Sequence, residues 1–461
     1  MTFHHADRDV PPPGCPAHAA RTPLYGPEFA ANPGRVYTQL RRHGPIAPVE
    51  LAPGIPATLV TGYQTALEVL RDPDRFPKDP RQWQQKIPAD CPVLPMMMYR
   101  PNCLFADGAR HARLRKAMTD SLDRVDSTAV RNSVERAAGT LLDRFAPAGH
   151  ADLLTQYARV LPLLTLSSIC GSPAEIGHRM LTAMSAVFDG INAEQANADL
   201  GHCLAELVAL KRSQPASDVT SWLMAHPAAL TDDEILHQLV VLMGAGSEPQ
   251  QNLIANTLRL LLSDDRFAGD LSGGTLPVDE ALDEVLWTDP PMANYGITYP
   301  MQDLELAGTR LPAHQPVVIS YAAANTDPSL ATDQTRTGNR AHLAFSAGPH
   351  TCPAPRLARV IASAAIERLL DRLPDMRLAV AADDLRWRPG PFHRALESLP
   401  VAFPPLPLSQ VKDQGDRRWA TTPAPTLSTP PEPTFTPKPP NSASKAPRRW
   451  WNSLAAWWRG Q

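Results

Sequence analysis

The stretch Ala344-Phe345-Ser346-Ala347-Gly348-Pro349-His350-Thr351-Cys352-Pro353 presents a single cysteine on a glycine-containing turn. A helical pattern begins directly after it, at residues 355–362. The free N–H groups and the dipole at the start of a helix favour negative charge, so they would stabilise a thiolate at Cys352. Cys352 is therefore predicted to be a nucleophile or a metal ligand. The alternative is a buried structural cysteine in a turn rich in glycine and proline.

The residues around Cys352 resemble the haem-binding loop of the cytochrome P-450 superfamily. Phe345, Gly348, His350 and Cys352 match the pattern Phe-Ser-x-Gly-x-His-x-Cys position for position, while Ala354 stands where the family usually has glycine. The resemblance implies that haem b is the cofactor and that the Cys352 sulfur is its axial iron ligand. A thiolate ligand favours O–O bond cleavage more than neutral histidine does.

Outside this loop, the apolar pattern is mainly helical between residues 109 and about 388. Residues 76–105 are rich in proline and methionine with weak periodicity, which is typical of a lid or a binding loop. This layout resembles the P-450 fold, a mainly α structure with small β-sheets, in a single large domain over residues 22–405. We expect helices at 32–42, 63–71, 109–122, 127–145, 153–170, 174–188, 192–213, 217–225, 231–262 and 278–288, and strands at 46–49, 57–61, 296–299, 304–306 and 317–319.

The composition indicates a reduced intracellular protein with a large buried core. Of the 461 residues, 43% are hydrophobic, and the net charge of −3 argues against a nucleic-acid binder. The N-terminus lacks the basic start and the apolar run of a signal peptide. The cysteines are scattered without a Cys-x-x-Cys pair, which argues against a zinc ribbon and a disulfide framework. They are Cys15, Cys91, Cys103, Cys170, Cys203 and Cys352.

Both ends of the chain differ from the body. Residues 1–21 are polar and proline-rich and are predicted to form a flexible arm, and residues 406–445 are predicted to be a disordered linker. Residues 446–461 place apolar side chains on one face of an amphipathic helix rich in Trp and Arg. This face could lie on a membrane surface or in the groove of a protein partner, or the segment could be a frayed tail. Its apolar residues are Trp450, Trp451, Leu454, Trp457 and Trp458.

His111 and Arg115 lie four residues apart, so they share one face of the expected helix 109–122. The pair resembles the His-x-x-x-Arg site that binds the haem propionates in bacterial P-450 proteins, and Arg pairs well with carboxylates. The resemblance also implies that His350 points to one haem propionate. The alternatives are a solvated basic face for the pair and a solvent-facing loop position for His350.

The segment Ala245-Gly246-Ser247-Glu248-Pro249 resembles the oxygen-binding segment Ala-Gly-x-Asp/Glu-Thr of the family. Ala245, Gly246 and Glu248 match, but Pro249 replaces the threonine whose hydroxyl helps to deliver protons in the family. A proline has no hydroxyl and no N–H, so the Ala245 carbonyl loses its helical donor and the helix is expected to kink. The freed carbonyl, a water and Glu248 could form a proton route. A simple kink without a catalytic purpose is the alternative.

Glu284-Val285-Leu286-Trp287 resembles the Glu-x-x-Arg motif of the family, with Trp287 in place of the arginine. The Glu-x-x-Trp form of the motif resembles that of an unusual actinomycete group of P-450 proteins that lack the arginine. A buried carboxylate without a cation is unfavourable, so Glu284 needs another donor, partial solvation or a proton. Arg336 and Arg340, which precede the cysteine loop, are candidate partners. The segment is otherwise an ordinary amphipathic helix.

The resemblance implies a haem-thiolate monooxygenase that inserts one oxygen atom from dioxygen into a small apolar substrate. Electrons would come from NAD(P)H through a ferredoxin and ferredoxin reductase, and no flavin domain is expected in the chain. A haem-bound sensor with weak or lost activity and a peroxide-using peroxygenase are the alternatives. The protein is expected in the cytoplasm, where the C-terminal helix could contact the inner face of the membrane. The expected substrate contacts are Met97, Met243, Gly244, Ala293 and Phe392.

Overall fold

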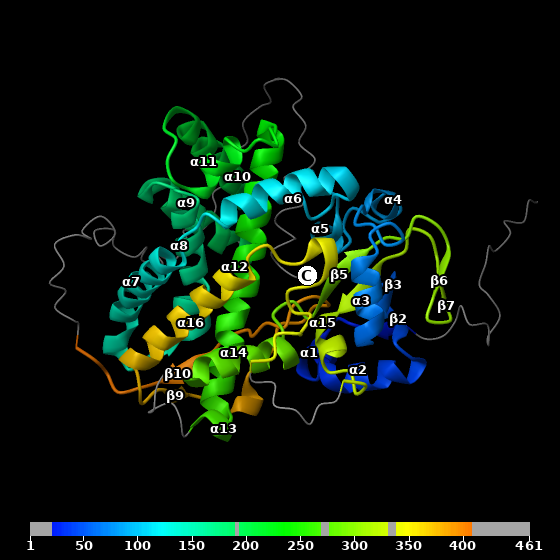
Figure 1. The fold of residues 1–461 in the computed structure, drawn as a ribbon. Coiled ribbons are helices and arrows are strands. Elements are labelled where there is room, and N and C mark those ends of the chain that lie inside the picture. Colours follow the sequence, from blue (N-terminus) through cyan, green and yellow to red (C-terminus); the bar gives the residue numbers. More distant parts are fainter. Residues whose placement is uncertain (1–20, 190–192, 269–275, 331–337, 408–461) are drawn as a thin grey trace, which may run out of the picture.

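The computed structural model describes residues 21–189, 193–268, 276–330 and 338–407 (Figure 1). This part of the chain is mainly helical with small sheets, which confirms the predicted fold class. The predicted N-terminal arm, Pro-rich linker and Trp/Arg-rich helix lie outside the described residues, apart from residue 21 of the arm and residues 406–407 of the linker. Within the described ranges, no helix combines the length and the apolar character needed to cross a bilayer.

The helices account for most of the described chain. The α-helices are α1 (Pro27–Ala31), α2 (Pro33–Leu40), α3 (Tyr63–Arg71), α4 (Arg81–Gln84), α5 (Leu94–Met97), α6 (Gly108–Leu122), α7 (Ser127–Phe145), α8 (Val160–Ile169), α9 (Ala174–Asp189), α10 (Ala193–Ser213), α11 (Val219–Met224), α12 (Asp232–Ser263), α13 (Asp265–Ala268), α14 (Leu276–Thr288), α15 (Tyr321–Asn325) and α16 (Pro355–Arg372). Short 3-10 or π turns are η2 (Arg41–His43), η3 (Ala146–Ala148), η4 (Leu154–Ala158), η5 (Gly348–His350) and η6 (Ala382–Asp384).

Local signals in the sequence set the start of the long helix α12. The Glu234 N–H donates to Thr231 Oγ1 at 3.2 Å, and the Thr231 N–H donates to the Glu234 carboxylate at 3.1 Å. These reciprocal bonds form a capping box, which satisfies two N–H groups that would otherwise lack partners at the start of the helix. The helix continues through Pro249 to Ser263, so the proline does not end it.

The strands form three sheets in the described chain. They are β1 (Thr22–Pro23), β2 (Ile46–Ala52), β3 (Ile55–Val60), β4 (His150–Asp152), β5 (Asn294–Thr298), β6 (Leu304–Leu306), β7 (Thr309–Leu311), β8 (Val317–Ser320), β9 (Arg377–Leu378) and β10 (Pro400–Ala402). The largest sheet has the order β1-β2-β3-β8-β5, with β3 and β8 parallel. The other sheets are β4-β10-β9 and the hairpin β6-β7. Figure 1 shows strands β2, β3 and β5 to the right of the helix-rich part.

Both faces of the largest sheet are covered by apolar side chains. Leu59 and Val318 pack in one cluster, while their chain neighbours Val60 and Ile319 pack in another. Successive residues of a strand point to opposite faces, so continuous apolar runs are required where both faces are buried. A third and larger cluster joins helices α6, α7, α8, α12, α14 and α16. The sheet and this helical core together hold α12 and the cysteine loop in place.

Candidate functional site

The cysteine loop is held against helix α3 by a close backbone contact at Gly348. Gly348 has a φ of +67°, and a Cβ at this position would overlap the Leu70 carbonyl oxygen and lie 2.9 Å from its carbon. Only glycine fits both the backbone conformation and the space. The Cys352 N–H donates to the Phe345 carbonyl at 2.8 Å, which closes the loop on itself.

Cys352 lies just before helix α16, as the sequence predicted. The Ala354 N–H donates to Cys352 Sγ at 3.4 Å. Burial raises the pKa of the Cys352 thiol, and the Ala354 N–H and the charge of Arg115 oppose that rise only in part. A metal ion that binds here would have to supply the positive charge that deprotonates the thiol.

A cavity of about 320 Å³ lies between this loop and helix α12. The cysteine loop contributes Cys352, Phe345 and His350 to its wall, and α12 contributes the segment 244–249 except Ser247. The cavity therefore brings together two motifs that lie about a hundred residues apart in the chain. Its remaining lining is mostly apolar.

The predicted substrate contacts divide into two groups. Met97 and Gly244 line the cavity. Met243, Ala293 and Phe392 are instead buried in the hydrophobic core and are not among the lining residues. On helix α12, Met243 and Gly244 are successive residues and so face different directions.

Tyr295 and Tyr299 line the cavity and were not predicted from the sequence. Tyr295 lies on β5, and Tyr299 directly follows this strand. Ile297, which lies between them in the sequence, also lines the cavity. The Tyr295 hydroxyl donates to the Met96 carbonyl at 3.0 Å, and the Tyr299 hydroxyl donates to the Met97 carbonyl at 3.5 Å. Gly296 lines the cavity as well, and the register of β5 against β8 shifts between Tyr295 and Thr298, so no simple alternation in the sequence identifies this wall.

Cationic and imidazole groups gather beside the cavity, where Arg115 and His350 line it and His111 packs against His350 without being a lining residue. The rings of His111 and His350 lie 4.0 Å apart between centroids, and the Nε2 atoms of both have no hydrogen-bond partner among the described residues. Burial, followed by the charges of His350 and Arg115, lowers the pKa of His111 to about 4. The Arg115 guanidinium donates to the Thr351 carbonyl, which joins α6 to the cysteine loop. Two imidazoles whose Nε2 atoms lack a hydrogen-bond partner, beside an arginine, fit the carboxylates of haem.

Glu248, on α12, is 3% exposed and forms an ion pair with Arg388. His393 Nε2 lies 3.8 Å from Glu248 Oε2 and also lines the cavity. Burial would raise the pKa of Glu248, but the charges of Arg388 and His393 outweigh burial and lower it. Glu248 is therefore an ionised carboxylate, and its partners Arg388 and His393 were not predicted from the sequence.

Trp287 makes a different contact from the arginine that it replaces in the family motif. Its indole Nε1–H donates to the Asn339 carbonyl at 2.7 Å, and its ring packs edge-on against His342 at 5.9 Å between centroids. His342 in turn lies 5.7 Å from the ring of Phe345. Trp287 thus ties α14 to the segment that leads into the cysteine loop without an ion pair.

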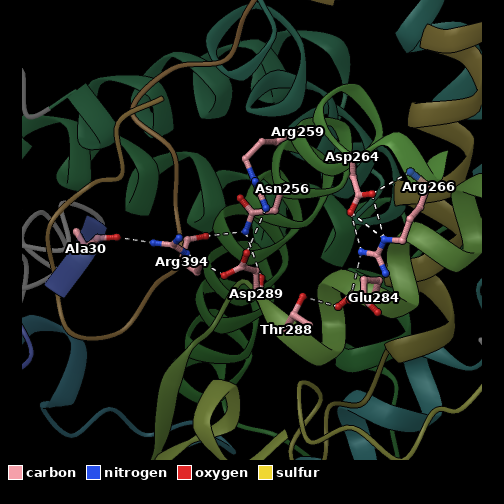
Figure 2. Close-up of polar contacts among 9 residues, drawn as sticks. All are labelled: Ala30, Asn256, Arg259, Asp264, Arg266, Glu284, Thr288, Asp289 and Arg394. Carbon is pink, nitrogen blue, oxygen red and sulfur yellow. Dashed lines mark hydrogen bonds and ion pairs between the residues drawn. The ribbon is translucent and has the colours of Figure 1, made fainter. Parts of the chain in front are cut away.

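Glu284 finds its cation on a neighbouring short helix. Arg266 Nη2 lies 3.8 Å from Glu284 Oε1 and also pairs with Asp264, as Figure 2 shows. The Glu284 side chain is 18% exposed, which gives the partial solvation that the sequence analysis allowed. Arg266 is thus one ion-pair partner of Glu284 that was not predicted from the sequence, while the candidate Arg336 lies outside the described residues.

A second ionic cluster fixes the C-terminal end of α14. Arg394 Nε donates to Asp289 Oδ1 at 3.0 Å, and Arg259 Nη2 lies 3.3 Å from Asp289 Oδ2. The Asn256 amide donates to the Arg394 carbonyl at 2.9 Å, so α12, α14 and the C-terminal segment meet here (Figure 2). This cluster orients the segment that carries His393 into the cavity.

The chain is similar to bacterial oxygenating enzymes over most of its length. It is 33% identical over 391 residues to the cytochrome P450 monooxygenase PikC of Streptomyces venezuelae, which covers 82% of this chain and 92% of PikC. It is 30% identical over 394 residues to 2-hydroxy-5-methyl-1-naphthoate 7-hydroxylase of Streptomyces carzinostaticus, which covers 81% of this chain and 96% of that enzyme. No protein-family model matches the chain.

The fold comparison agrees with the sequence comparison. The solved structure of CYP154C4 from Streptomyces sp. W2061 has a TM-score of 0.73 at 30% identity and covers 83% of this chain and 97% of that one. The similarity therefore extends over a whole domain and not over the cysteine loop alone. Relatives named as monooxygenases and hydroxylases share this length of sequence. The chain accordingly belongs to the bacterial cytochrome P450 family and is an oxidoreductase of the P450 monooxygenase type.

Proposed function

We propose that this protein inserts one oxygen atom of dioxygen into a small apolar substrate, with electrons from NAD(P)H delivered by a ferredoxin and its reductase. The cavity that joins Cys352 to an apolar wall is the observation that supports this proposal. Iron protoporphyrin IX would be held by Cys352, with its carboxylates near His111, Arg115 and His350. When bound, this cofactor supplies the dioxygen chemistry.

The β5 wall of the cavity supports an apolar substrate. The hydroxyls of Tyr295 and Tyr299 are engaged by the backbone of Met96 and Met97. The two rings and the Met97 side chain are therefore left to meet a substrate through apolar contact and not through hydrogen bonds. Burial raises the pKa of both tyrosines, so both stay neutral at physiological pH.

Proton delivery is proposed to use Glu248 and His393 in place of a threonine hydroxyl. Pro249 cannot donate to the Ala245 carbonyl, and the Ser247 hydroxyl already donates to the Met243 carbonyl at 2.6 Å. His393 lines the cavity beside Glu248, and Arg388 is 26% exposed, which connects this pair to solvent. Burial lowers the pKa of His393, and the charge of Glu248 opposes this only in part. His393 would therefore carry an extra proton only while it passes the proton from the solvent side into the cavity.

A peroxygenase that uses hydrogen peroxide is the second candidate function, and Pro249 favours it. Peroxide already carries the electrons and protons that reduction of dioxygen would require. Such a reaction would tolerate the missing threonine hydroxyl. The two candidates share the cofactor and the cavity and differ in the source of the oxygen atom.

Turnover with isotopically labelled dioxygen separates the two reactions. The purified holoprotein would be given 6-deoxyerythronolide B, mycinamicin IV or vitamin D3. Three of its relatives are named after these compounds. With NADPH, a ferredoxin and its reductase, we expect a product that carries one labelled oxygen atom, detected by mass spectrometry. Cys352→Ala is the inactive control.

Product with peroxide alone, and none with the ferredoxin couple, would replace the proposal by the peroxygenase. No product under either condition from a protein that binds haem and these compounds would favour a sensor.

A further inference from the structure

Lys78 is a buried cation in the cavity wall that no sequence motif singles out. It lies in the segment between α3 and α4, is 8% exposed and lines the cavity. Its Nζ donates to the Ile297 carbonyl of β5 at 3.1 Å. Its backbone N–H donates to Asp107 Oδ2 at 2.8 Å, which fixes the loop that carries it.

The protein leaves this ammonium without a close anion. Among the described residues, no carboxylate oxygen lies within 4.0 Å of Lys78 Nζ. The one hydrogen bond that Nζ donates within the described chain is to a neutral carbonyl. Burial lowers the pKa of Lys78 to about 8, and the more distant charge of Asp107 opposes this only in part. Burying a charge is unfavourable unless an opposite charge or several hydrogen bonds compensate it.

Lys78 shares its end of the cavity with the other groups that fit haem carboxylates. Arg115 and His350 line the same cavity, and the charge of Lys78 lowers the pKa of both His111 and His350. The four side chains are therefore within electrostatic range of one another. Asp107 is the acidic member of the group, with Oδ1 3.8 Å from His350 Nε2.

We propose that Lys78 pairs with a carboxylate of the bound cofactor from the β5 side, while α6 contributes His111 and Arg115. Haem has two carboxylates, and a second cation from a different element would hold the pair from two directions. This role rests on the proposed cofactor, iron protoporphyrin IX. The alternatives are a purely structural tie to Ile297 and a contact with an acidic substrate.

The rate of haem loss to excess apomyoglobin tests this role without measuring turnover. Lys78→Met keeps the apolar stem and removes the charge, and we expect haem loss about tenfold faster, since a charge-assisted hydrogen bond contributes on the order of 1.5 kcal/mol or more. Lys78→Arg keeps the charge and should stay near the wild-type rate. Lys86→Met is the matched control, because Lys86 is exposed and does not line the cavity.

Haem dimethyl ester, in which both carboxylates are blocked, separates carboxylate recognition from a structural role. Full-length protein reconstituted with the ester should lose it at nearly the same rate in the wild type and in Lys78→Met. The same tenfold difference with the ester, or no difference with unmodified haem, would overturn the proposal. A thiolate-type carbon-monoxide spectrum of Lys78→Met would verify that the cysteine loop is intact. A protein that binds haem but oxidises nothing would refute the proposed reaction and not the role of Lys78.

Discussion

Replacing Gly348 with alanine is expected to prevent stable loading of the cofactor. The new Cβ would overlap the backbone of α3 at Leu70 and lie 3.1 Å from the Arg71 Cα. Backbone atoms inside a helix cannot move aside as a flexible side chain can. Together with the left-handed φ, this overlap should destabilise the loop by about 3 kcal/mol or more, on the order of a hundredfold. The ratio of haem to protein absorbance in the purified variant measures the effect.

Gly54→Ala is the matched control for this variant. Gly54, in the turn between β2 and β3, has a φ of +74°, close to that of Gly348, but a Cβ there would meet no atom within 4 Å. It should therefore lose about 1 kcal/mol from backbone strain alone and keep its haem. Equal haem content in the two variants would contradict the close packing of the cysteine loop on α3.

Replacing Arg388 with methionine is expected to destabilise the fold by about 3 kcal/mol at neutral pH, because Glu248 would be left as a buried charge. Glu248 is 3% exposed, and His393 and the weaker charge of Arg159 would remain near it. Urea unfolding of the holoprotein, followed by circular dichroism, measures the change. The double variant Arg388→Met, Glu248→Gln should recover most of the lost stability, since the buried carboxylate is then gone.

The pH dependence of this effect has a defined sign. In the wild type the pKa of Glu248 is lowered, so its stabilising contribution is present above the unfolded pKa of about 4.3 and is lost as the pH falls through the folded pKa. Without Arg388, burial would raise the folded pKa instead. The variant should then lose stability as the pH rises above about 4.3. A loss of stability that is the same at pH 5 and pH 8 would argue against an ionised Glu248.

Features that depend on neighbouring residues were predictable from the sequence. The helix 127–145 and the capping box at Thr231 follow from apolar spacing and from side chains within one turn of the helix. Cys352 could be recognised because its turn and the helix after it are continuous in the chain. The predicted helix 153–170 was only partly right, because the structure begins it with the π turn η4 before α8.

The contacts across the cavity could not be predicted, because they join residues far apart in the chain. Arg388 reaches Glu248 across 140 residues, and Lys78 reaches Ile297 across 219. Charged residues are common, and no local pattern distinguishes the one that the fold buries. Glu284 illustrates this point, because no local pattern pointed to its ion pair with Arg266 beside α14.

The carbon-monoxide difference spectrum of the reduced full-length protein tests the central claim, that Cys352 binds the haem iron as a thiolate. The account predicts a thiolate-type band in the wild-type protein and its complete loss in Cys352→Ala. As a control, replacement of Cys103, a buried cysteine that also lines the cavity, by alanine should leave the band in place. A wild-type protein that binds no haem, or a band that persists in Cys352→Ala, would contradict the account.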